Sequence, residues 1–408
     1  MTEGLADVKG RATAELERLY GLWADGGSGL LITGNVQIDR FHLERPGNVI
    51  IERAPDSETM AALTRMATAG KRGGGHIWMQ ISHAGRQTPI TVNPHPKAPS
   101  ATAVALPGKQ FGDPVALTEA EIEDLIERFG VAAEVAKAAG FTGVQIHAAH
   151  GYLLSAFLSP RANTRTDRYG GSLENRSRML MEVAGRVRRG VGPNFPISVK
   201  LNSADFQKGG FAFEDSLAVA EQLQAAGVDL IEISGGSYEQ PAMMDIEGME
   251  PAEQQTVKAS TAAREAYFVE FAKAMQATVK IPLMVTGGFR TRAAMEQALA
   301  GGAVSVIGLG RPLCVDPDGP KQLMSGAATL QRWEQKLRLL PSWLGVLRGL
   351  KMITALEGFA VTYWYYAQIE ALARTGRAKP SISPFAAFLE VNRNGAAWLK
   401  ARGERAPR

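Results

Sequence analysis

The sequence predicts an α/β fold, a (β/α)8 TIM barrel that lacks most of its first strand and carries a helical C-terminal extension. Amphipathic helical segments alternate with short apolar segments over more than 250 residues, which is typical of parallel strands joined by helices. The glycine-rich turns follow the last two apolar segments. A doubly wound open sheet, the structural alternative, would usually place such a turn after its first strand.

Seven helix and strand pairs follow one another along the chain. The third helix is marked by a capping box, because Thr118 stands three residues before Glu121. The predicted pairs, each a helix and then a strand, are 13–24 with 30–33, 59–69 with 76–80, 119 onward with 143–147, 173–188 with 197–201, 213–226 with 230–234, 263–277 with 282–286, and 291–300 with 304–309.

Closing a barrel of this kind takes eight strands, so one strand is missing from the count. The chain begins with a helix where a barrel should begin with a strand, and only Met1 and Thr2 remain as a stump of it. We expect residues that belong upstream of Met1 to supply the rest. We divide the chain into an N-terminally incomplete barrel region, residues 1–316, and a closing helix with a helical extension, residues 317–408.

Composition restricts the class of protein. The 408 residues carry a net charge of +4, but no dense run of lysine and arginine suggests nucleic acid as a partner. The single cysteine, Cys314, excludes intrachain disulfides and a cysteine-rich metal or iron–sulfur site. We find no secretory signal and no apolar run that would span a membrane. We therefore expect a cytoplasmic protein, either a monomer or a homo-oligomer, that acts on a small molecule.

The most informative segment is the end of the strand 143–147, which is the fourth strand of the barrel when the missing first strand is counted. There an apolar run ends in polar side chains. The strand 143–147 ends at His147, and His150 and Tyr152 follow directly. Two imidazoles placed there can hold an electronegative oxygen, and a phenol nearby can supply a proton. The alternative is that all three side chains only form hydrogen bonds in a polar loop.

Two further polar residues fall on predicted strands. Gln80 ends the strand 76–80, and its amide offers both a donor and an acceptor, which suits the edge of a flavin pyrimidine ring. Lys200 lies among apolar residues of the strand 197–201, where a cation can stabilise negative charge on a reduced flavin. The alternative is that Lys200 pairs with a carboxylate of the barrel.

The last two strands end in the segments VTGGFR and IGLGRP. They bring Gly287, Gly288 and Gly310 together with Arg290 and Arg311. Bare backbone N–H groups beside a guanidinium form a phosphate site, and barrels often have one after strands seven and eight. The turns therefore predict a phosphate site, although glycine pairs by themselves are weak evidence.

These segments together give a resemblance to a known family. Residues 1–316 resemble the old yellow enzyme family of FMN-dependent ene-reductases. The motifs that carry the resemblance are QISHAGR, IHAAHGYLLSAFLSP followed by N-x-R-T-D-x-Y-G-G-S-x-E-N-R, and the turns VTGGF and GLGRP.

The resemblance implies FMN as cofactor, NADH or NADPH as reductant, and hydride transfer to the β-carbon of an activated alkene. It implies that His147 and His150 hold the carbonyl or nitro oxygen of the substrate and that Tyr152 donates the proton. Lys200 stands where the family often has arginine near flavin N1. The other cofactor-binding residues that it implies are Thr2, Asn35, Gln80, Gly287, Gly288, Gly310 and Arg311.

Two other interpretations stay open. A metal-dependent barrel hydrolase could use His147 and His150 as ligands, although no carboxylate flanks them at a recognised ligand spacing. We expect no metal site. A flavin-binding or inactive remnant is the second alternative, because a barrel without its first strand is incomplete.

Overall fold

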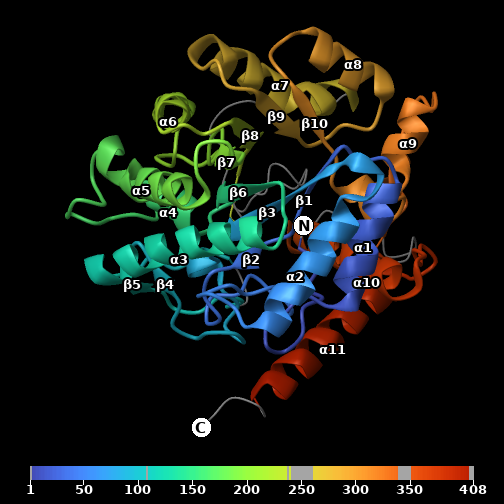
Figure 1. Ribbon diagram of the computed structural model, residues 1–408, viewed down its shortest axis with the longest axis horizontal. Coiled ribbons are helices and arrows are strands. Elements are labelled where there is room, and N and C mark those ends of the chain that lie inside the picture. The colour runs from blue at the N-terminus through green and yellow to red at the C-terminus, as the bar shows by residue number, and fades with distance from the viewer. Residues whose placement is uncertain (1, 107–108, 237–238, 240–260, 339–350, 404–408) are drawn as a thin grey trace.

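The computed structural model describes residues 2–106, 109–236, 239, 261–338 and 351–403 (Figure 1). Seven parallel strands form one curved sheet in the order β1, β3, β6, β7, β8, β9 and β10, as the sequence predicts, and a short strand, β2, also pairs with β3. The strands are β1 (Leu30–Ile32), β2 (Val36–Gln37), β3 (His76–Ser82), β6 (Gly143–Ala148), β7 (Ile197–Asn202), β8 (Leu230–Ser234), β9 (Leu283–Thr286) and β10 (Val306–Gly308).

The two ends of this sheet, β1 and β10, are not paired with each other in the described part of the chain. The first described residues lie against the end of β1. Asn35 donates from its backbone N–H to Thr2 Oγ1 at 3.3 Å, and Gly34 donates to Glu3 Oε1 at 2.9 Å. Thr2 therefore lies next to the segment that follows the C-terminal end of β1.

Helices pack on the outside of the strands, as Figure 1 shows. The capping box of α3 is present, with Thr118 and Glu121 each accepting a hydrogen bond from the other's backbone N–H. A large apolar cluster fills the space between sheet and helices. The helices that follow the strand alternation are α1 (Ala14–Asp25), α2 (Ser57–Gly70), α3 (Glu119–Ala138), α5 (Leu173–Val191), α6 (Phe213–Ala225), α7 (Thr261–Thr278) and α8 (Arg292–Ala300).

Some short elements were not predicted. Strands β4 (Lys97–Ala98) and β5 (Val115–Ala116) form a separate two-stranded parallel sheet. Helix α4 (Leu153–Leu158) follows the end of β6, and all six of its residues are buried. These elements are too short to show a helical or alternating pattern in the sequence.

The C-terminal segment contributes α9 (Gly319–Met324), α10 (Lys351–Thr375) and α11 (Pro384–Gly403). A second apolar cluster joins α10 and α11 to Leu19 of α1, and Trp364 and Tyr365 are buried in it. Arg18 adds a hydrogen bond from Nη1 to Ala373 O at 2.6 Å. The extension thus packs on its own barrel, while the division of the chain at residue 316 stays a prediction.

Among the described residues, no helix is both long enough and apolar enough to cross a membrane.

Candidate active site

His147, His150 and Tyr152 lie together at the C-terminal end of β6. The ring centroids of His147 and Tyr152 are 4.9 Å apart, those of the two imidazoles 5.1 Å, and those of His150 and Tyr152 6.5 Å. His147 and Tyr152 are buried, and His150 is partly buried. The sequence placed these three side chains at one strand end, and the structure brings their rings into one cluster.

The local backbone selects the tautomer of His147. Ala149 donates its backbone N–H to His147 Nδ1 at 3.3 Å, so this nitrogen accepts and Nε2 carries the proton. Burial, with a further contribution from the charge of Lys200, lowers the pKa of His147 well below its usual value. His147 is therefore a neutral donor through Nε2. That tautomer leaves no lone pair on Nε2 for a metal, which argues against the hydrolase alternative.

His150 is held from several sides in an uncommon backbone conformation. Its φ is 63°, a left-handed value that few residues other than glycine adopt. The backbone N–H donates to Asn202 Oδ1 at 3.1 Å, Gln87 Nε2 donates to the His150 carbonyl at 2.8 Å, and the ring Nε2 lies 2.6 Å from Ser234 Oγ. Burial, followed by Lys200, also lowers the pKa of His150 well below its usual value. The ring is thus neutral and fixed in place.

A row of hydrogen-bonded polar side chains crosses the interior of the sheet. Gln80 Nε2 donates to Gln145 Oε1 at 2.6 Å, Gln145 Nε2 donates to Glu232 Oε2 at 2.8 Å, and Lys200 Nζ donates to Glu232 Oε1 at 2.7 Å. Lys200 does pair with a barrel carboxylate, the alternative that the sequence left open. Sequence reasoning missed Gln145 and Glu232, although a carboxylate inside the apolar strand LIEIS was a usable signal.

The glycine turns after β9 and β10 lie beside two arginines. Gly287 and Gly288 have φ values of 142° and 76°, so the first turn depends on glycine. A Cβ on Gly310 would meet no atom within 4 Å, which leaves open space beside this turn. Burial lowers the pKa of Arg290, and the nearby charge of Arg311 lowers it further. Arg311 directly follows Gly310 in the chain, so positive charge stands next to backbone that carries no side chain.

Thr2 and Asn35 occupy the end of β1. Both are buried, and Thr2 Oγ1 accepts the backbone N–H of Asn35. The carbonyl of Asn35 accepts from Asn48 Nδ2 at 3.2 Å. The main-chain N–H of Asn35 already has a partner. The second lone pair of its carbonyl and its buried side-chain Oδ1, which has no hydrogen-bond partner among the described residues, remain for a ligand.

These residues fit an FMN molecule. Gln80 uses one N–H on Gln145, which leaves its Oε1 and second N–H without partners in the described part of the chain. This donor and acceptor pair matches the edge of a pyrimidine ring. The open space at Gly310, which Arg311 follows in the chain, has the charge and the room that a phosphate needs.

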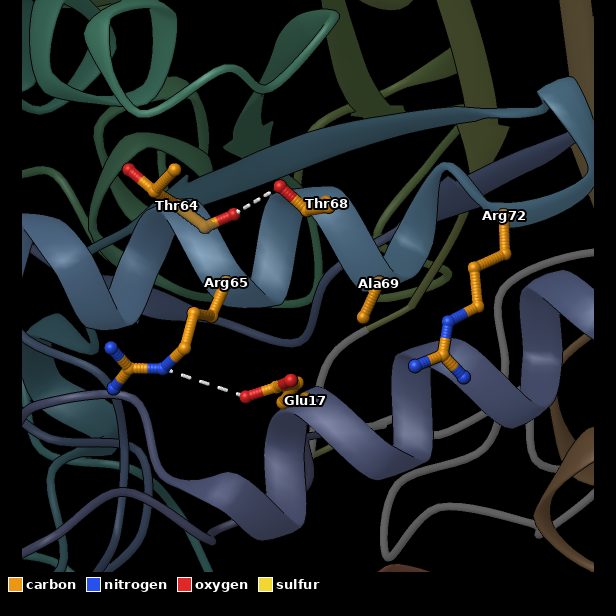
Figure 2. A pocket seen from close by; sticks show the side chains of 6 residues that line it. All are labelled: Glu17, Thr64, Arg65, Thr68, Ala69 and Arg72. Atoms are coloured by element: carbon orange, nitrogen blue, oxygen red, sulfur yellow. Dashed lines mark hydrogen bonds and ion pairs between the residues drawn. The ribbon is translucent and has the colours of Figure 1, made fainter.

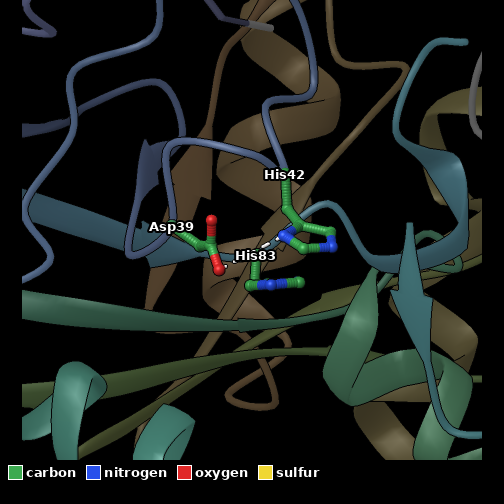
Figure 3. Close-up of side chains that lie close together, drawn as sticks. All are labelled: Asp39, His42 and His83. Atoms are coloured by element: carbon green, nitrogen blue, oxygen red, sulfur yellow. Dashed lines mark ion pairs between the residues drawn. The ribbon is translucent and has the colours of Figure 1, made fainter. Parts of the chain in front are cut away.

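A second histidine cluster lies near the ends of β2 and β3 (Figure 3). Ligand-type atoms of Asp39, His42 and His83 all lie within 4.8 Å of one another. However, His42 Nε2 accepts from Lys97 N–H at 2.8 Å, and His83 Nδ1 accepts from Gly85 N–H at 3.1 Å. The opposite nitrogen of each neutral ring must then carry the proton and can bind no metal.

This cluster is therefore better explained as a set of donors around one carboxylate. His42 Nδ1 lies 3.2 Å from Asp39 Oδ2, and Arg128 Nη1 lies 3.4 Å from the same oxygen. Burial opposes ionisation of Asp39, but the hydrogen bonds from His42 and from the Phe41 N–H lower its pKa. The carboxylate therefore connects the loop after β2 to Arg128 of α3.

A groove of about 200 Å³ lies between α1 and α2 (Figure 2). Its sides include Glu17, Arg65 and Arg72, and the Arg65 side chain is 60% exposed. None of the predicted site residues lines this groove. It is a feature of the outer helix layer and takes no part in the site at the strand ends.

Comparison with known proteins agrees with this geometry. The sequence profile of the NADH:flavin oxidoreductase / NADH oxidase family matches residues 1–329. The chain is 37% identical over 349 residues to the NADH-dependent flavin oxidoreductase iliE of Hypocrea jecorina, which covers 79% of this chain and 83% of the relative.

Two solved structures are also similar. An old yellow enzyme homologue from Zymomonas mobilis matches with a TM-score of 0.66 and 26% identity, over 84% of this chain and 91% of the other. A 2-naphthoyl-CoA reductase in complex with 2-naphthoyl-CoA matches with a TM-score of 0.71 and 26% identity, over 81% of this chain and 50% of the other. The predicted TIM barrel is confirmed. The chain therefore belongs to the NADH:flavin oxidoreductase / NADH oxidase family, the old yellow enzyme family of FMN-dependent oxidoreductases that use NADH or NADPH.

Proposed function

We propose that this protein reduces the carbon–carbon double bond of an activated alkene, such as an enone or a nitroalkene. The observation that carries the proposal is the cluster of two neutral imidazoles and one phenol at the end of β6. Gln80, Lys200, Thr2 and the glycine turns would hold FMN next to this cluster. When bound, FMN takes a hydride from NADH or NADPH and passes it to the β-carbon of the alkene.

The imidazoles bind the substrate oxygen. His147 donates through Nε2–H, and His150 provides a second ring whose position is fixed by Ser234 and Asn202. Hydrogen bonds to a carbonyl or nitro oxygen draw electron density from the conjugated double bond, so the β-carbon becomes more electrophilic. Both rings are neutral and held in place by hydrogen bonds, and such donors need little reorganisation when charge develops on the oxygen.

Tyr152 completes the reaction as proton donor. Its ring centroid lies 4.9 Å from that of His147, which would place the phenol beside a substrate held by the imidazole. The phenol O–H bond breaks, a C–H bond forms at the α-carbon, and the phenolate regains a proton from solvent. Hydride and proton together account for both hydrogens added across the double bond.

The two half-reactions provide the test. Tyr152→Phe should slow reduction of cyclohexenone by roughly 10²- to 10⁴-fold, because it removes only the proton donor. Reduction of bound FMN by NADPH, followed in a stopped-flow instrument through loss of the flavin absorbance, should stay unchanged. Equal loss of both half-reactions would refute the role of Tyr152.

The alternative of an inactive remnant has its own readout. The purified protein is incubated with FMN, and the unbound FMN is then removed. A protein that retains no flavin absorbance after this treatment would support that alternative. A yellow protein that NADPH bleaches and cyclohexenone restores would support the reductase.

A further inference from the structure

The polar row of the barrel interior contains two residues for which the proposed reaction has no direct use. Gln145 is fully buried, and the side chain of Glu232 is 3% exposed. They connect Gln80 on β3 to Lys200 on β7 through β6 and β8, in a parallel register that sets Gln80 opposite Gln145 and Lys200 opposite Glu232. Both ends of the row are residues that would touch FMN.

The ionised carboxylate of Glu232 determines which group donates and which accepts in each hydrogen bond of the row. An ionised carboxylate only accepts hydrogen bonds, so Glu232 obliges Gln145 to present its Nε2. The oxygen of Gln145 must then face Gln80, and Gln80 must turn its own nitrogen toward it. As a result the amide oxygen of Gln80 is left to face a ligand. The carboxylate on β8 thereby selects one of the two amide orientations of Gln80 on β3, three strands away.

The carboxylate of Glu232 also compensates the positive charge of Lys200. Burial opposes the charged form of Glu232, but the charge of Lys200 and the hydrogen bonds it receives lower its pKa. Because Glu232 Oε1 lies 2.7 Å from Lys200 Nζ, the pair presents little net charge to its surroundings. Removal of the carboxylate would leave a nearly buried, unpaired ammonium group.

We infer that Glu232 and Gln145 are positioning residues for FMN: Glu232 fixes the amide orientation of Gln80 through Gln145 and sets the charge that Lys200 presents to the flavin. The inference rests on the proposed site for the cofactor. It predicts separate effects for the two residues. Gln145 should act on flavin affinity, and Glu232 on both affinity and reduction potential.

The test uses the full chain, with the dissociation constant of FMN from flavin fluorescence and the midpoint potential from dye-coupled reduction. Gln145→Met should weaken FMN binding about tenfold, the loss of one to two well-placed hydrogen bonds, and leave the potential unchanged. Glu232→Gln should raise the potential. A tenfold preference for the reduced over the oxidised flavin corresponds to a rise of about 30 mV for a two-electron couple.

Two controls complete the design. Ser198→Ala alters another fully buried polar side chain of β7, opposite Gln145, and should change neither quantity. The double variant Glu232→Gln with Lys200→Met carries no unpaired charge, so it should fold if Glu232→Gln alone does not. Its potential should be no higher than that of the unaltered protein, because the cation has gone as well.

The outcomes separate the inference from the proposed site. If Gln80→Met leaves FMN affinity unchanged, the site itself is wrong. If Gln80→Met weakens binding but Gln145→Met does not, the orientation relay is overturned. If Glu232→Gln lowers the potential or leaves it unchanged, the charge balance is overturned.

Discussion

Arg290 donates from Nη2 to Glu334 Oε1 at 3.0 Å and so joins the glycine turn after β9 to the segment that follows the barrel. The Arg290 side chain is 4% exposed and that of Glu334 21%. Tyr365 of α10 donates to the other carboxylate oxygen at 2.7 Å. The C-terminal extension therefore holds a guanidinium group beside the predicted phosphate site.

Loss of this carboxylate charge should destabilise the protein. Glu334→Gln leaves the nearly buried Arg290 without an ionic partner, and we expect the free energy of unfolding to fall by about 1–3 kcal/mol. Tyr365→Phe, the matched control, removes one hydrogen bond and should cost about 1 kcal/mol. Urea unfolding of the three proteins, followed by circular dichroism, measures both values. A smaller loss in Glu334→Gln than in Tyr365→Phe would contradict the importance of the ion pair.

Stability should depend on pH through the buried histidines. Burial is the main cause that lowers the pKa of His83, His147 and His150 well below the usual value. Below about pH 6.5 the unfolded chain then binds protons that the folded protein does not, so stability falls as the pH falls. The slope should reach about 1.4 kcal/mol per pH unit for each such histidine. Urea unfolding at a series of pH values from neutral downward measures it.

Single substitutions can assign this slope. His83→Gln should reduce it, because His83 is almost fully buried. His95→Gln, at an exposed histidine, should leave it unchanged. Identical slopes in His83→Gln and in the unaltered protein would show that the acid sensitivity arises elsewhere.

The backbone of His150 limits which residues can replace it. Asparagine accepts a left-handed φ and keeps a donor, whereas glycine accepts the backbone and offers no donor. We expect His150→Asn to retain most of the alkene reduction, and His150→Gly to lose roughly 10²- to 10³-fold in kcat, the usual cost of one oxyanion donor. Steady-state kinetics with cyclohexenone checks this. Equal activities of the two variants would remove His150 from oxygen binding.

The two glycine turns should respond differently to alanine. Gly310→Ala places a methyl group in open space, so the stability without cofactor should not change, while FMN binding should weaken because the phosphate needs that space. Gly287→Ala forces a side chain into a positive φ and within 3.3 Å of Phe268, and should cost about 1–2 kcal/mol. Thermal unfolding with and without FMN distinguishes the two effects. Unchanged FMN affinity in Gly310→Ala would move the phosphate to another place.

The sequence predicted the strand and helix order because each element carries its own periodic pattern. The ion pair of Lys200 with Glu232 could not be predicted in this way. Glu232 lies on the next strand, and the two side chains face each other only in the observed register. A pattern within one strand holds no information on that register. The tautomer of His147 likewise depends on the turn at Ala149, which has no sequence signature of its own.

The apolar cluster shared by α1 and α10 has a consequence for biosynthesis. Leu19 is completely buried, and its apolar neighbours include Trp364 and Leu372, which leave the ribosome more than three hundred residues later. The side of α1 that carries Leu19 therefore stays uncovered through most of translation, until α10 has been synthesised. Transiently exposed apolar surface of this kind promotes aggregation, and shortening the chain before α10 would leave Leu19 permanently uncovered.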